Sequence, residues 1–186
     1  MKYSVTLHYH KSTYVLSRPI VSRRDVVPTL KEFHECFSTK KGSYPKILQT
    51  DNAKDYLSTA LTNFWSERGI QEVPLFAFTQ TDNGEAEQLN TTIGDTACTI
   101  LHSSSLPENF WPYAYQFETY LHNILPNKCT KDSMPLETMF NVQPSASTLY
   151  QFRTEAIIQI PTLTTPKLQP WAFNAILIEY PTRARE

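Results

Sequence analysis

Hydrophobic and polar residues alternate over the first twenty positions and then recur at helical spacing. Residues 2–10 and 13–20 alternate well enough for two strands, and the short polar connection between them predicts a hairpin. A helix is expected next, capped by Asp25, because one face of the following segment is apolar. That face consists of Val26, Leu30, Phe33 and Phe37.

Strands and helices are predicted to alternate through the middle of the chain. Residues 45–50 form a short apolar strand that ends at Asp51, and residues 70–76 form another. The helix between them should end at Gly69 and bury Leu57, Leu61, Phe64 and Trp65. A long helix then carries Glu87 in its first turn, with an apolar stripe of Ala86, Leu89, Ile93, Ala97, Ile100 and Leu101.

The last third is expected to change from helical to β-rich. Pro107 opens an amphipathic helix that should stop by Pro126, and residues 135–140 form a brief helix. Two further strands are predicted in residues 155–161 and 173–180, joined by a proline-rich segment. This order predicts an α/β domain over residues 1–145 with a small β-rich appendage over residues 146–186.

Composition limits the classes of function. No apolar run is long enough to span a membrane and no leader is visible at Met1, so we expect an intracellular protein, nuclear or cytoplasmic, without a membrane partner. Three widely spaced cysteines fit reduced thiols. A formal net charge of −1 argues against tight, autonomous binding of nucleic acid.

Two carboxylates are the candidates for chemistry. The 35 residues between Asp51 and Glu87 hold one predicted helix and one strand, which is enough chain to bring both acids to one rim of a sheet. Two acids there could hold a divalent metal ion of the kind that phosphoryl transfer requires. Taken singly, Asp51 also fits a turn or a helix cap, and Glu87 fits a glutamate favoured by the helix dipole. The nearby acids are interpreted as solvated: Asp55, Asp82 and Glu85.

Histidine and cysteine chemistry is disfavoured. His8 and His10 share a strand face, but we interpret both as exposed. His34 and Cys36 are two residues apart on a helix, so they do not share a face. No Cys or His pair has the spacing of a zinc finger. As possible nucleophiles, Cys98 falls in an apolar helical stripe and Cys129 in a loop without an adjacent base.

Several motifs in the same order resemble the integrase core of copia-type retrotransposons. The family's Asp-Asn-Gly, acid and aromatic motif is matched by Asp51, Asn52, Ala53, Asp55 and Tyr56. Its Asn-Gly-x-x-Glu-Arg-x-Asn motif is matched by Asn83, Gly84, Glu87, Gln88 and Asn90, and the family also places 35 residues between these acids. Further similarity lies in LPENFWPYAYQFETYLHN, PLETMFNVQPS and KLQPWAFNAILIEY.

The resemblance implies an RNase H-like mixed sheet with flanking helices and metal-dependent DNA strand transfer. In the family three carboxylates hold two Mg²⁺ or Mn²⁺ ions, so Asp51 and Glu87 become expected ligands and catalytic residues. Asn52, Asn83 and Asn90 become candidate nucleic-acid contacts, with DNA as a weak partner.

This sequence also departs from the family pattern. The family's first catalytic acid lies on a strand before the hairpin, and this chain begins at the hairpin. Ala53 replaces a glycine, and Gln88 and Thr91 replace arginines that contact phosphate. We therefore expect a degenerate integrase remnant that is inactive alone. The alternative is a non-catalytic module that binds nucleic acid weakly or associates with itself or with an intact integrase.

Overall fold

The computed structural model describes residues 1–50, 58–74, 80–127, 130, 132–160 and 170–180, and leaves undescribed the side chains of residues 74, 80–83, 85 and 146. The described elements form an α/β structure, as predicted. Its strands pair in three two-stranded sheets, β1 with β2, β3 with β4, and β5 with β6. Within the described residues, every helix is too short or too polar to cross a bilayer.

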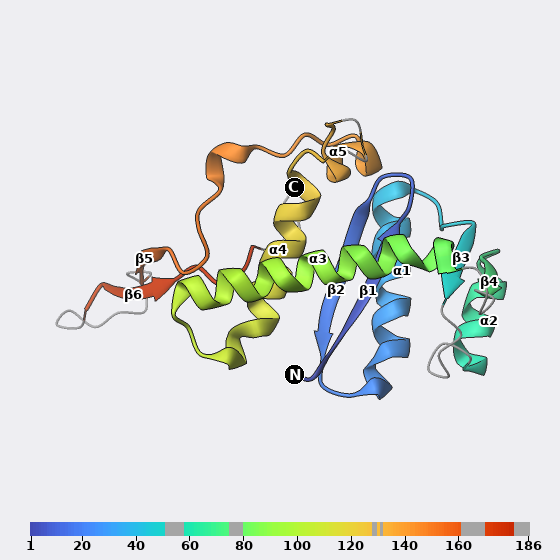
Figure 1. Cartoon of the computed structure of the whole chain (residues 1–186), viewed down its shortest axis with the longest axis horizontal. Helices are drawn as coiled ribbons and strands as arrows, with labels where there is room; N and C mark the ends of the chain where they lie inside the picture. The colour runs from blue at the N-terminus through green and yellow to red at the C-terminus, as the bar shows by residue number, and fades with distance from the viewer. Residues whose placement is uncertain (51–57, 75–79, 128–129, 131, 161–169, 181–186) are drawn as a thin grey trace.

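The predicted N-terminal hairpin and helix are both confirmed. Strands β1 (Tyr3–Tyr9) and β2 (Tyr14–Ile20) pair antiparallel, with Leu7 opposite Leu16. Helix α1 (Val26–Lys41) lies behind the hairpin and buries all four predicted apolar residues of its face (Figure 1). Asp25 occupies the N-cap position of α1, as predicted, but its side chain does not cap that helix. The carboxylate instead accepts from the Ser22 amide at 2.9 Å within a capping box one turn earlier.

The next sheet is short and parallel. Strands β3 (Ile47–Thr50) and β4 (Gln71–Pro74) flank helix α2 (Thr59–Glu67), as the sequence predicted. Gly69, with φ of 66°, ends the helical segment in the left-handed conformation that glycine adopts without strain. Leu48, Phe64 and Trp65 belong to the same hydrophobic core as the side chains of β1, β2 and α1. The two sheets therefore share one core although no described hydrogen bond joins them as a sheet.

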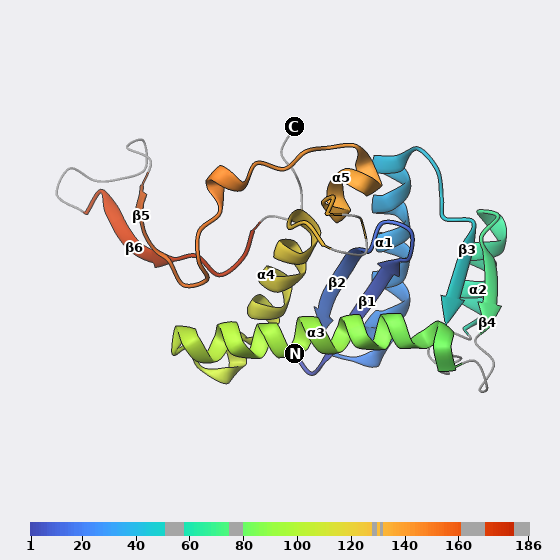
Figure 2. The same cartoon turned by 45° about the horizontal axis from the view of Figure 1, so that its top comes forward.

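Two helices form a second layer. Helix α3 (Gln80–Ser104) packs against helix α4 (Trp111–Ile124) through a small cluster that includes Ala97, Leu101 and Ala114. Figure 2 shows α3 running past the hairpin toward the β3–β4 pair while α4 stands beside β2. Helix α5 (Pro135–Phe140) closes the core through Met139.

The C-terminal strands form a hairpin that projects from the rest. Strands β5 (Glu155–Gln159) and β6 (Ala172–Ile176) pair antiparallel, as predicted, and reach away from the helices in both views. Aromatic contacts on α4 hold the base of this hairpin. Phe152 lies 5.3 Å from Phe117 between ring centroids, and Tyr180 stacks on Tyr120 at 4.6 Å.

Candidate metal and nucleic-acid site

The first candidate ligand follows the end of β3. The structure describes β3 to Thr50, so Asp51 and Asn52 lie just beyond the described residues. Thr50 itself is buried, and its hydroxyl donates to the Glu72 carboxylate of β4 at 3.3 Å. Because β3 and β4 are parallel, their carboxyl ends lie at the same edge, which is where the sequence analysis placed the site.

The second candidate ligand lies farther along its helix than expected. Helix α3 begins at Gln80, so Glu87 sits in its third turn and not in the first. It lies roughly 10 Å along the helix axis from Gln80, and its side chain is exposed. In both cartoon views the N-terminal end of α3 lies near the carboxyl ends of β3 and β4. The approach of Asp51 to Glu87 stays a prediction, since only Glu87 is among the described residues.

The expected nucleic-acid contacts lie on the same helix where they are described. Asn90 is exposed on α3, three residues after Glu87, so the two share a helix face. Asn83 lies in the helix backbone, but its side chain is outside the described set, as are those of Asp82 and Glu85. Among the described residues, α3 therefore exposes the amides of Gln88 and Asn90 close to the Glu87 carboxylate.

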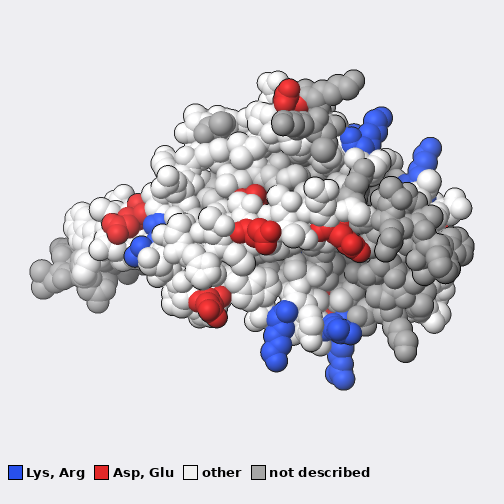
Figure 3. All heavy atoms as spheres, in the orientation of Figure 1, with Lys and Arg blue, Asp and Glu red and all other residues white. Residues whose placement is uncertain are grey.

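The charge of α3 disfavours contact with phosphate. Its sequence contains Asp82, Glu85, Glu87 and Asp95 and neither lysine nor arginine. Figure 3 shows acidic groups along this face, with the lysine and arginine groups near its edges. Thr91, at a position where the resemblance leads us to expect arginine, donates its hydroxyl at 2.9 Å to the Glu87 carbonyl of its own helix. Among the described side chains of α3, the exposed charged groups are the carboxylates of Glu87 and Asp95, whereas DNA binding would need positive charge.

The other titratable candidates are separated. His34 is fully buried on α1 whereas Cys36 is exposed, which confirms that the two do not share a face. Cys98 is exposed, so its placement in an apolar stripe was wrong: it falls between the buried positions of α3. His10 is exposed as expected, but His8 is half-buried. Among the described residues no three histidine, cysteine, aspartate or glutamate side chains gather as metal ligands do, and Cys129 is not one of those residues.

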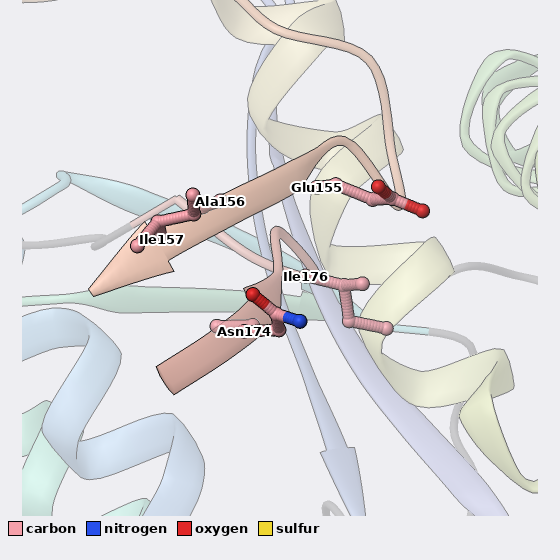
Figure 4. A pocket seen from close by; sticks show the side chains of 6 residues that line it. Glu155, Ala156, Ile157, Asn174 and Ile176 are labelled. Carbon is pink, nitrogen blue, oxygen red and sulfur yellow. The ribbon is translucent and has the colours of Figure 1, made fainter. Parts of the chain in front are cut away.

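A hollow of about 570 Å³ lies on the C-terminal hairpin, away from Glu87. Figure 4 shows side chains of this hollow, to which Glu155, Ile157, Asn174 and Ile176 contribute. Glu155 is the one titratable group in the lining of this hollow. Its side chain is exposed, as are all residues of β5. A single exposed carboxylate among apolar and amide groups lacks the paired acid and base that catalysis needs.

The sequence analysis missed two features. It did not predict that the buried amide of Asn123 would pair with a strand edge, although a polar residue on the inner face of an amphipathic helix was a signal. It also did not separate the two faces of the C-terminal hairpin. The signal there was the even-numbered apolar series Ala156, Ile158 and Ile160.

A search of protein-family models finds no match to the chain. Among curated proteins, the chain is 28% identical over 179 residues to the retrovirus-related Pol polyprotein from transposon TNT 1-94 of Nicotiana tabacum, which covers 96% of the chain and 14% of the polyprotein. It is 27% and 25% identical over 151 residues to the Pol polyproteins from transposons RE1 and RE2 of Arabidopsis thaliana. Each of these alignments covers 81% of the chain and 10% of the polyprotein.

These relatives confirm the predicted resemblance. They are Pol polyproteins of plant copia-type transposons, and similarity to them extends over most of the chain. The chain itself spans only about one seventh or less of their length.

Proposed function

We propose that this chain, a relative of the Pol polyproteins of plant copia-type transposons, is the remnant of an integrase core that does not transfer DNA strands by itself. The proposal is carried by one observation: the chain aligns with those polyproteins while β3 leads into Asp51 and α3 carries Glu87. These are the two positions where the resemblance expects catalytic carboxylates.

The strand arrangement supports an RNase H-like sheet as the ancestral fold. Strands β1 and β3 are the inner members of their two pairs in both views, and α1 lies next to β1 on the side toward β3. Both pairs bury side chains in one core. A strand placed between β1 and β3 could pair with both and join the four strands into one five-stranded sheet. The strand that precedes the hairpin in the family fits this position.

The chain itself supplies two of the carboxylates that the resemblance expects at the metal site, Asp51 and Glu87. In the family the strand before the hairpin carries a third, and no residue among these 186 corresponds to it. When bound, Mg²⁺ or Mn²⁺ stabilises the attacking and leaving oxygens at phosphorus. Two carboxylates supply fewer oxygen ligands for these ions than three carboxylates do. In addition, the acidic sequence of α3 does not attract the DNA backbone.

A strand-transfer assay tests the proposal. The 186-residue chain is incubated with a labelled model of a transposon end and a target duplex, with Mg²⁺ or with Mn²⁺. We expect no joined product with either metal ion, and no joined product from the Asp51→Asn variant. Metal-dependent product from the natural chain that disappears in Asp51→Asn would show that two carboxylates suffice, and the proposal of inactivity would fail.

Residual DNA binding, if retained, should be weak and independent of sequence. The formal net charge of −1 and the acidic α3 leave few phosphate contacts, so fluorescence anisotropy on any short duplex should show affinity that is lost as salt rises. Retention of the duplex at high salt would indicate base or stacking contacts and would contradict this proposal.

A further inference from the structure

The two faces of the C-terminal hairpin differ sharply. Residues opposite one another in an antiparallel pair point to the same side, so the register divides β5 and β6 into two sets. One set is mixed: Glu155, Ile157, Gln159, Ala172, Asn174 and Ile176. The other is entirely apolar, and we call it the apolar face: Ala156, Ile158, Ile160, Trp171, Phe173 and Ala175. Ile160 belongs to it because its amide donates to the Trp171 carbonyl at 2.8 Å.

The apolar face is exposed over its largest side chains. Trp171 is 60% exposed, Phe173 51% and Ile158 45%. A two-stranded hairpin is only marginally stable in water unless its apolar face packs on something. An exposed apolar surface that is continuous, rather than scattered, marks an interaction site.

The hairpin is held in place at its base while its strands project. Arg153 and Leu177 are joined at that base, where the Arg153 amide donates to the Leu177 carbonyl at 2.7 Å. Phe152 and Tyr180 then anchor the flanking chain on α4. Figures 1 and 2 show β5 and β6 reaching outward from this anchor. The apolar face is therefore presented to a partner by a fixed support.

We propose that the apolar face is a homodimer interface, in which the hairpins of two copies pack face to face about a two-fold axis. The face carries no charged side chain, so two copies meet without repulsion. One strand contributes the aromatic residues Trp171 and Phe173, and the other contributes the aliphatic residues Ile158 and Ile160. A two-fold axis through the centre of the face can set the aromatic strand of each copy against the aliphatic strand of the other.

The size of the face sets the strength of the dimer. Aromatic side chains that are half exposed contribute on the order of 100 Å² each, and the whole face roughly 400 Å² per copy. A standard stable interface buries about 800 Å² per partner. The face offers about half of that area, so we expect a weak dimer that forms at high micromolar concentration.

Sedimentation equilibrium between low and high micromolar concentration tests the interface. Phe173→Thr removes an aromatic group from the apolar face but keeps a residue suited to a strand. Ile157→Thr is the matched control, because Ile157 is 78% exposed yet lies on the mixed face. We expect the natural chain to dimerise, Phe173→Thr to weaken dimerisation at least fivefold, and Ile157→Thr to change it less than twofold.

Amide exchange of Ile160 and the emission of Trp171 complete the test. Protection of the Ile160 amide in both variants shows that the hairpin still forms. Trp171 is the most exposed of the three tryptophans, so its share of the emission should shift to the blue as the natural chain dimerises. A chain that stays monomeric at about 200 μM, the top of the concentration range tested, overturns the proposal. So does equal weakening by both substitutions, which would indicate unspecific hydrophobic association. Neither result depends on strand-transfer activity.

Discussion

The side-chain amide of Asn123 pairs with the backbone of Val15 as a neighbouring strand would. Its Nδ2 donates to the Val15 carbonyl at 2.7 Å, and its Oδ1 accepts from the Val15 amide at 2.9 Å. Both residues are buried. Helix α4 thereby covers the outer edge of β2, and the outer edge of β1 is the one that faces the β3–β4 pair.

Substitution of Asn123 by alanine should destabilise the fold strongly. The change leaves a buried amide and a buried carbonyl without their partner, and each unsatisfied group costs about 1–3 kcal/mol. We expect the free energy of unfolding to fall by about 2–4 kcal/mol in urea titrations. The exchange rate of the Val15 amide should rise in the same variant.

Asn90→Ala is the control for that substitution. Asn90 is exposed on α3, so the same chemical change should alter the free energy of unfolding by less than about 0.5 kcal/mol. Equal effects at positions 90 and 123 would mean that the paired amide contributes nothing specific.

Stability should fall in mild acid because of His34. This side chain is fully buried beside Phe64, and within the described residues neither ring nitrogen has a hydrogen-bond partner. Burial lowers the pKa of His34 from 6.5 to about 4. The unfolded chain therefore takes up a proton first, so stability is full above pH 6.5 and falls by about 3 kcal/mol as the pH drops toward 4.

His34→Leu checks this assignment. Leucine fills similar space without a titratable group, so the variant should lose most of the slope of unfolding free energy between pH 6.5 and 4. An unchanged slope would assign the acid sensitivity to other groups.

Glu118 on α4 should make the stability of the fold depend on pH in the opposite direction. Burial raises the pKa of its carboxyl from 4.5 to about 7. The folded state favours the neutral acid, so this contribution to stability is full below pH 4.5 and is lost as the pH rises through 7. Glu118→Gln should raise the free energy of unfolding by about 1–2 kcal/mol at pH 8, after allowance for partial exposure, and leave it nearly unchanged at pH 4. The exposed residue Glu108 provides the control, and Glu108→Gln should have little effect at either pH.

Most helices and strands could be predicted from the sequence because their periodicity is local. The buried residues of α1 follow directly from the spacing of Val26, Leu30 and Phe33. The cap at Ser22 was missed because a capping box and a simple Asp25 cap have similar sequences. The start of α3 was placed several residues late, since the polar run from Gln80 to Gly84 has no apolar stripe to mark a helix.

The candidate site was less predictable because it depends on contacts between distant segments. Motif order and spacing made Glu87 a candidate ligand, which stays a prediction, but nothing local shows how α3 lies relative to β3. The pairing of Asn123 with Val15 joins residues 108 positions apart, and no periodicity reports such a contact. The joining of β1–β2 to β3–β4 in one sheet was inferred from family resemblance alone and stays a prediction.

Tyr180 links the C-terminal hairpin to the rest of the molecule through two separable contacts. Its hydroxyl accepts from the Tyr150 amide at 2.5 Å, while its ring stacks on Tyr120 and lies 5.4 Å from Phe117. Tyr180→Phe removes the first contact and keeps the second, so exchange of the Tyr150 amide should accelerate without loss of the hairpin's position. Tyr180→Ala removes both.

Limited proteolysis distinguishes the two Tyr180 variants. The ring contacts join the hairpin base to α4, and Tyr180→Ala removes those with Tyr120 and Phe117. This variant should therefore open more readily and be cleaved between residues 141 and 154 at least several-fold faster than Tyr180→Phe. Equal cleavage of both variants would mean that Phe152 alone holds the hairpin on α4. In that case Phe152→Ala should be the variant that releases it, because its ring contact with Phe117 would be the anchor that remains.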